Sequence, residues 1–133
     1  MRKYQLTSGK VLEFNLAGIE QALELFRVVT SECKNAGLDF NFTPETRIID
    51  AIMSNKEALL NIFSSKTVME AVCECCNKVL YDKKHFSLNL FEEENARADF
   101  FSVMVIVGVE NLTPFFPQVH LYLEPILNLF LKN

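Results

Sequence analysis

The stretch RKYQLTSGKVLEFNL, residues 2–16, decides how the chain begins to fold. Apolar and polar residues alternate on both sides of the turn-forming Ser8-Gly9 pair. This period of two predicts a β-hairpin whose apolar side chains share one face. A three-residue loop over residues 8–10 keeps that face intact because it pairs Leu6 with Leu12, so we expect this register. A hairpin alone is marginally stable in water, so its apolar face must rest on helices.

Helical periodicity replaces this alternation in the rest of the chain. Apolar residues recur at spacings of three and four over residues 17–36, and Gly37 is typical of the position after a helix. Further helices are predicted from about residue 44, over 54–63, from Ser64 or Ser65 to 80, over 93–112 and over 115–131, with a polar turn and loop at 81–90. The prediction is a mainly α fold: a compact helical domain of about five helices with an N-terminal β-hairpin. Residues 1–133 form a single domain, with the hairpin at 2–16 and a helical bundle at 17–131.

Composition excludes several classes of protein. Leu, Ile, Val and Phe make up 47 of the 133 residues, well above the roughly 20% below which chains tend to stay disordered. The net charge is −4 and positive charges are not clustered, so a nucleic-acid partner is not expected. The longest nearly apolar run, Phe100–Val109, is about half of the ~20 residues that cross a bilayer, so no membrane partner is expected either. Residues 1–6 have no apolar stretch of signal-peptide length, which predicts an intracellular protein.

Reactive side chains are few and scattered. Cys73 and Cys76 share a helix face while Cys75 points away, and no second short-spaced pair completes a zinc site. The cysteines are therefore expected to pack in the core. His85 and His120 have no nearby nucleophile motif, and phosphate-binding glycine loops are absent from the sequence. We expect no catalytic residues, no cofactor and no bound metal, and hence no enzyme.

The C-terminal stretch carries more apolar residues than one core-facing stripe requires. A helix that is apolar nearly all round is either buried centrally or covered by a partner, and both alternatives stay open here. The partner alternative gives the hypothesis of a binding or self-association surface, made of Phe116, Leu121, Leu127, Phe130 and Leu131.

Three segments resemble one family, the tail assembly chaperones of long-tailed (siphovirus-type) bacteriophages. They lie in the family's order and spacing and cover nearly the whole chain. The first runs from LTSGK at 6–10 to ALELF at 22–26, the second from SSK at 64–66 to Tyr81-Asp82, and the third from ARADF at 96–100 to ENLTPFF at 110–116. Two departures, Thr7 and Gly18, stand where the family usually has proline, so both exits of the hairpin are less rigid here.

The resemblance implies a function in the host cell cytoplasm during virion assembly. Such chaperones bind the apolar tape measure protein and keep it soluble until the tail tube assembles around it, and they are not expected in the mature virion. The major tail (tube) protein, a longer frameshifted form of the chain and further copies in a homo-oligomer are the other partners to consider. The family has no catalytic residues to transfer. The alternative from another class is a small helical adaptor or regulator that binds a host protein.

Overall fold

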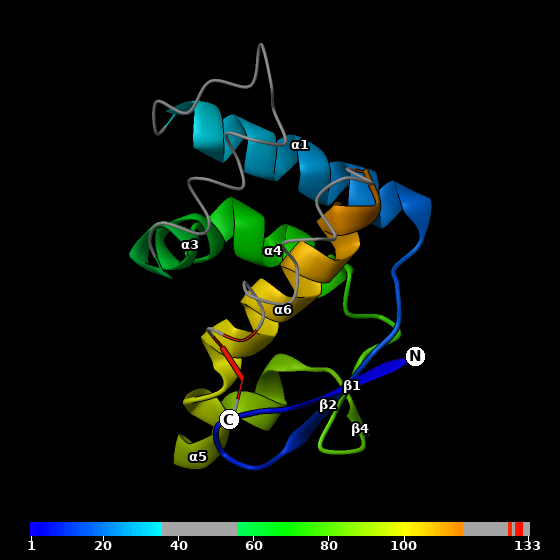
Figure 1. The fold of residues 1–133 in the computed structure, drawn as a ribbon, viewed down its shortest axis with the longest axis vertical. Helices are drawn as coiled ribbons and strands as arrows, with labels where there is room; N and C mark the ends of the chain where they lie inside the picture. The colour runs from blue at the N-terminus through cyan, green and yellow to red at the C-terminus, as the bar shows by residue number, and fades with distance from the viewer. Residues whose placement is uncertain (36–55, 116–127, 129, 132–133) are drawn as a thin grey trace.

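A computed structural model describes residues 1–35, 56–115, 128, 130 and 131. In chain order its elements are β1 (Arg2–Gln5), β2 (Val11–Phe14), α1 (Ile19–Asn35), α3 (Lys56–Phe63), α4 (Lys66–Glu74), β3 (Leu80–Tyr81), β4 (Lys84–His85), η1 (Leu88–Phe91), α5 (Glu94–Arg97), α6 (Phe100–Leu112) and η2 (Thr113–Phe115). Figure 1 shows α6 running through the middle, with α1 and α4 on one side and the sheet on the other.

The fold class predicted from the sequence is wrong. The described residues form an α+β fold with a four-stranded antiparallel sheet, in the order β1-β2-β3-β4, instead of five helices and one hairpin. Its longer helices are α1, α3, α4 and α6, and α5 has four residues. The prediction of a helical bundle over 17–131 fails for the same reason, because β3 and β4 lie within that range.

The missed strands belong to a hairpin that begins at Leu80, the predicted end of a helix, and continues into the predicted polar turn and loop; the helix itself, α4, ends at Glu74. Its turn places Asp82 and Lys83 in the left-handed region, at φ of 52° and 64°. Two left-handed residues are the requirement of the tight hairpin turn whose usual sequence is Asn-Gly or Asp-Gly. Since the second of these residues is lysine rather than glycine, the sequence lacks the usual signal for this hairpin.

The N-terminal hairpin is confirmed, but its predicted register is wrong by two residues. Tyr4 pairs with Leu12, and the amide of Leu6 donates to Lys10 O at 2.9 Å, so the loop is residues 7–9. Gly9 has φ of 93°. A three-residue loop commonly places its left-handed residue last, which puts the glycine at the end of the loop. A shift of two residues keeps the same faces together, so the apolar face is preserved.

Helix α6 is the centre of the core. All residues from Val103 to Asn111 are buried, and the helix is apolar on nearly every side. The predicted helix over 93–112 is confirmed with a break at Ala98-Asp99, and the helices predicted over 17–36 and 54–63 correspond to α1 and α3. The helix predicted from residue 44, Gly37 and most of the helix predicted over 115–131 lie outside the described residues.

One helical stretch in the described part of the chain, Glu94–Phe115, is long and apolar enough to cross a membrane. Of its most apolar window, 56% is buried inside the protein. A core helix has the same length and composition, so this finding is weak evidence for a membrane span.

Close packing around α6 depends on Gly108. A Cβ atom at this position would clash with the ring of Phe63 from α3. Gly108→Ala should therefore destabilise the protein by about 1–3 kcal/mol in urea unfolding, because the ring is buried and must shift. Gly18→Ala is the matched control, since its Cβ would meet mainly the flexible end of the Gln21 side chain. Equal stability of the two variants would contradict this packing.

Candidate functional site

Two buried carboxylates stand on one face of the α6 segment. Asp99, just before the first residue of α6, is fully buried, and Glu110 is 2% exposed. Eleven residues separate them, which is about three turns of α-helix, so both side chains face the same way. The β1–β2 hairpin lies on that side, and each carboxylate contacts one end of it.

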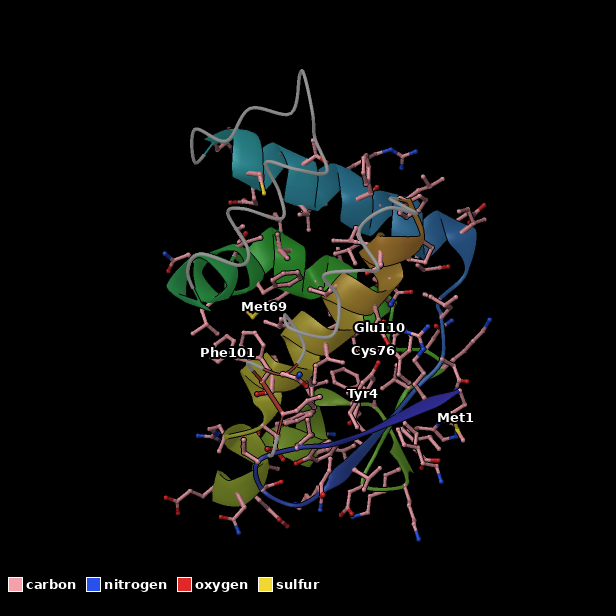
Figure 2. All side chains as sticks on the ribbon, in the orientation of Figure 1. Met1, Tyr4, Met69, Cys76, Phe101 and Glu110 are labelled. Atoms are coloured by element: carbon pink, nitrogen blue, oxygen red, sulfur yellow. The ribbon has the colours of Figure 1, made fainter. Side chains whose placement is uncertain are left out.

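Glu110 binds the beginning of the hairpin. Its two oxygens accept hydrogen bonds from Arg2 Nη1 at 2.6 and 2.7 Å, and Oε2 also accepts from the hydroxyl of Tyr4. Figure 2 shows Tyr4 on β1 lying close to Glu110 on α6. Burial, and then the hydrogen bond to Glu110, raise the pKa of Tyr4 to about 12. The same carboxylate raises the pKa of Arg2, chiefly through its hydrogen bond.

Asp99 binds the turn of the hairpin. Its Oδ2 accepts from Ser8 Oγ at 2.5 Å and from Tyr81 Oη at 2.7 Å, although Asp99 stands at the N-cap position, where a side chain usually caps the helix. Burial, and then the bond to Asp99, raise the pKa of Tyr81 well above its ordinary value. Lys10 Nζ lies 5.6 Å from the centre of the Tyr81 ring. Oδ1 of Asp99 has no hydrogen-bond partner among the atoms of the described residues.

Asn111 fixes the exit of the hairpin. Its Nδ2 donates to Val107 O at 2.9 Å, and its Oδ1 accepts from the amide of Ala17 at 2.9 Å. Three polar side chains associated with α6 therefore hold the start, the turn and the exit of the N-terminal segment. We call Asp99, Glu110 and Asn111 the α6 anchors.

The hydrogen bonds of the α6 anchors join elements of the fold to one another. Glu110 is engaged by Arg2 and Tyr4, and Asp99 by Ser8 and Tyr81. A nucleophilic serine needs a base in contact with it. Ser8 contacts the carboxylate of Asp99, but the same carboxylate oxygen also accepts a hydrogen bond from Tyr81 in the core. In the described ranges no group of three His, Cys, Asp or Glu residues could hold a metal ion.

The cysteines pack as predicted from the sequence. Cys33, Cys75 and Cys76 are buried, and Cys73 is half-buried against the core. Burial raises the pKa of Cys33 and of Cys75 to about 11, and it also raises that of Cys73 and Cys76. A raised pKa disfavours the thiolate that a nucleophile or metal ligand requires. His85 is exposed on β4, and His120 lies outside the described residues.

The five residues predicted to bind a partner fall in two groups. Phe116, Leu121 and Leu127 lie outside the described residues. Phe130 is 3% exposed within the core cluster, and Leu131 is half-buried against that cluster. The burial of Phe130 favours a core role for this residue.

Exposed apolar side chains occur elsewhere in the described residues. Figure 2 places Met1 and Phe101 at opposite sides of the molecule, so they do not form one surface. Sequence reasoning placed Leu16 and Ile19 on buried faces, yet they are 52% and 64% exposed. The sequence does carry a signal for this exposure. The alternation of the strand and the helical periodicity of α1 are both interrupted between them, by the polar Asn15 and the small Ala17-Gly18 pair. The other exposed large apolar residues in the described part of the chain are Met1, Leu88 and Phe101.

Comparisons with known proteins found no matching family model, no matching curated protein and no matching solved structure.

The buried carboxylate of Glu110 can be tested by removing it. Glu110→Ala should lower the free energy of unfolding by about 2 kcal/mol, because the half-buried hydroxyl of Tyr4 loses its acceptor. Glu110→Gln retains an acceptor and should cost less. The matched control is Glu70→Ala, since Glu70 is exposed on α4 and a substitution there should change stability by less than about 0.5 kcal/mol. Equal losses for Glu110→Ala and Glu70→Ala in urea unfolding would refute the anchoring role.

The raised pKa of Tyr4 predicts a loss of stability at alkaline pH. The pKa of Tyr4 is about 12 in the folded protein and near 10 when unfolded, so the folded state retains its proton longer. The contribution of protonated Tyr4 to the free energy of unfolding is complete below pH 10 and is lost as the pH rises toward about 12. Urea unfolding across this range should give a steeper fall for the wild type than for Tyr4→Phe. Identical slopes would contradict the raised pKa.

Proposed function

We propose that this protein is a tail assembly chaperone of a long-tailed bacteriophage, which binds the tape measure protein and keeps it soluble until the tail tube assembles around it. The observation that carries the proposal is a contact among three distant segments. Ser8, Tyr81 and Asp99 come one from each segment that resembles the family, and both hydroxyls donate to the same Asp99 oxygen. The three similar segments thus meet at one buried carboxylate, that of Asp99, which links them within a single fold.

The arrangement of polar groups supports a binding function. The buried carboxylates of the described residues anchor the hairpin, and the proposal therefore assigns the function to a surface. Shielding a long apolar chain requires apolar surface repeated over many copies, since weak contacts add up through multivalency. A chaperone must also release its partner, which favours small interfaces.

The C-terminal stretch is the proposed binding surface. Phe116, Leu121 and Leu127 are its proposed contacts, with Leu131 at its margin. Phe130 is buried in the core, so it is not among the proposed contacts. The major tail (tube) protein and a longer frameshifted form are proposed as further partners, and the host cytoplasm as the place of action.

Co-expression with the tape measure protein from the same genome tests the proposal. The soluble fraction of the tape measure protein should rise severalfold when this chain is present, and Leu127→Asp should abolish that gain. Leu88→Asp is the control, because Leu88 is 59% exposed on η1 and outside the proposed surface. Circular dichroism of each variant must show the wild-type helical signal.

Two results would count against the proposal. An insoluble tape measure protein in the presence of the well-folded wild-type chain would remove the chaperone function. Capture of a host protein, with no effect on tape measure solubility, would favour the adaptor or regulator instead.

A further inference from the structure

The junction between β2 and α1 exposes two apolar side chains where the sequence pattern predicts burial. Leu16 is 52% exposed and Ile19 is 64% exposed. They lie three residues apart, between the end of β2 at Phe14 and the first turn of α1. We call Leu16 and Ile19 the junction patch.

Hydrogen bonds hold the junction patch in place on both sides. Before it, Asn15 Nδ2 donates to Lys78 O at 3.0 Å, and after Leu16 the amide of Ala17 donates to the buried Asn111 side chain at 2.9 Å. The amide of Ala22 donates to Gly18 O at 3.1 Å, which continues the first turn of α1. The exposure of Leu16 and Ile19 is therefore built into the fold, and a surface held this way loses little conformational entropy on binding.

Residues of opposite charge lie next to the two ends of the segment that carries the junction patch. Glu20 follows Ile19 on α1, and Lys78 lies beside Asn15, whose side chain binds its carbonyl. Both are exposed, and neither forms an ion pair within the described part of the chain. Arg2 also lies at this end of the sheet but is held by Glu110.

We propose that the junction patch joins two copies of this chain about a two-fold axis, with Glu20 of each copy facing Lys78 of the other. A two-fold interface uses the same patch twice, so it needs a patch that is complementary to itself. An apolar centre with an acidic side and a basic side meets this condition, because the rotation brings each side against its opposite.

The dimer is expected to be weak. Two apolar side chains per copy provide much less than the roughly 800 Å² per partner of a typical stable interface. The association should therefore appear on concentration and weaken with salt, since its charged border is solvent-exposed. The proposal does not rest on the tail assembly function.

Sedimentation velocity over a concentration series tests the apolar centre. The wild type should shift from monomer to dimer, and Ile19→Asp should weaken dimerisation by at least about tenfold, because the substitution enters the interface twice. Leu88→Asp is the matched control, since Leu88 is similarly exposed at 59% on another element. A wild type that stays monomeric at the highest soluble concentration, or equal effects of the two variants, would overturn the proposal.

Charge exchange tests the pairing itself. Glu20→Lys alone and Lys78→Glu alone should each remain monomeric, since each places like charges opposite one another twice. An equimolar mixture of the two single variants should dimerise, because every contact across the two-fold axis is then between opposite charges. Both positions are exposed, so folding should be unaffected. If the mixture behaves as the sum of its two components, Glu20 and Lys78 do not face each other.

Discussion

Burial of α6 is the constraint on which the rest of the structure depends. The helix is apolar on nearly every side, so it is stable in water only when other elements surround it. Helices cover one side, and the sheet covers the other. The helix also brings Glu110 into the core and follows directly on Asp99, and a buried carboxylate is costly unless donors reach it. The hairpin supplies those donors through Arg2, Tyr4 and Ser8, which fixes the position of the sheet against the helix.

The parts of the fold that local patterns encode could be predicted from the sequence. The hairpin, α1 and α3 follow from periods of two and 3.6, the long apolar helix from the length of its apolar stretch, and the buried cysteines from their residue type. The second hairpin could not be predicted, because its left-handed turn is built from Asp82 and Lys83 without glycine. The α6 anchors were missed as well, since Ser8, Tyr81 and Asp99 meet only after the chain has folded. No local signal distinguishes a buried carboxylate from an exposed one.

The structure separates apolar residues of the core from apolar residues at the surface. Excess apolar sequence at the C-terminus first suggested a binding surface, and one of its five residues, Phe130, is buried in the core. The exposed large apolar side chains among the described residues include Leu16 and Ile19, where sequence periodicity predicts core positions. In the described residues, the α6 anchors join elements of the fold to one another, and the junction patch is a small exposed apolar surface.

The central claim is that the hairpin and α6 form one cooperative unit through the buried carboxylates. Native-state hydrogen exchange measures this most directly, because it reports the opening free energy of each amide. The account predicts that the paired amides of β1 and β2 exchange with the same opening free energy as those of α6. Rapid exchange of the hairpin while α6 stays protected would show that the helix is buried without it, and would contradict the account.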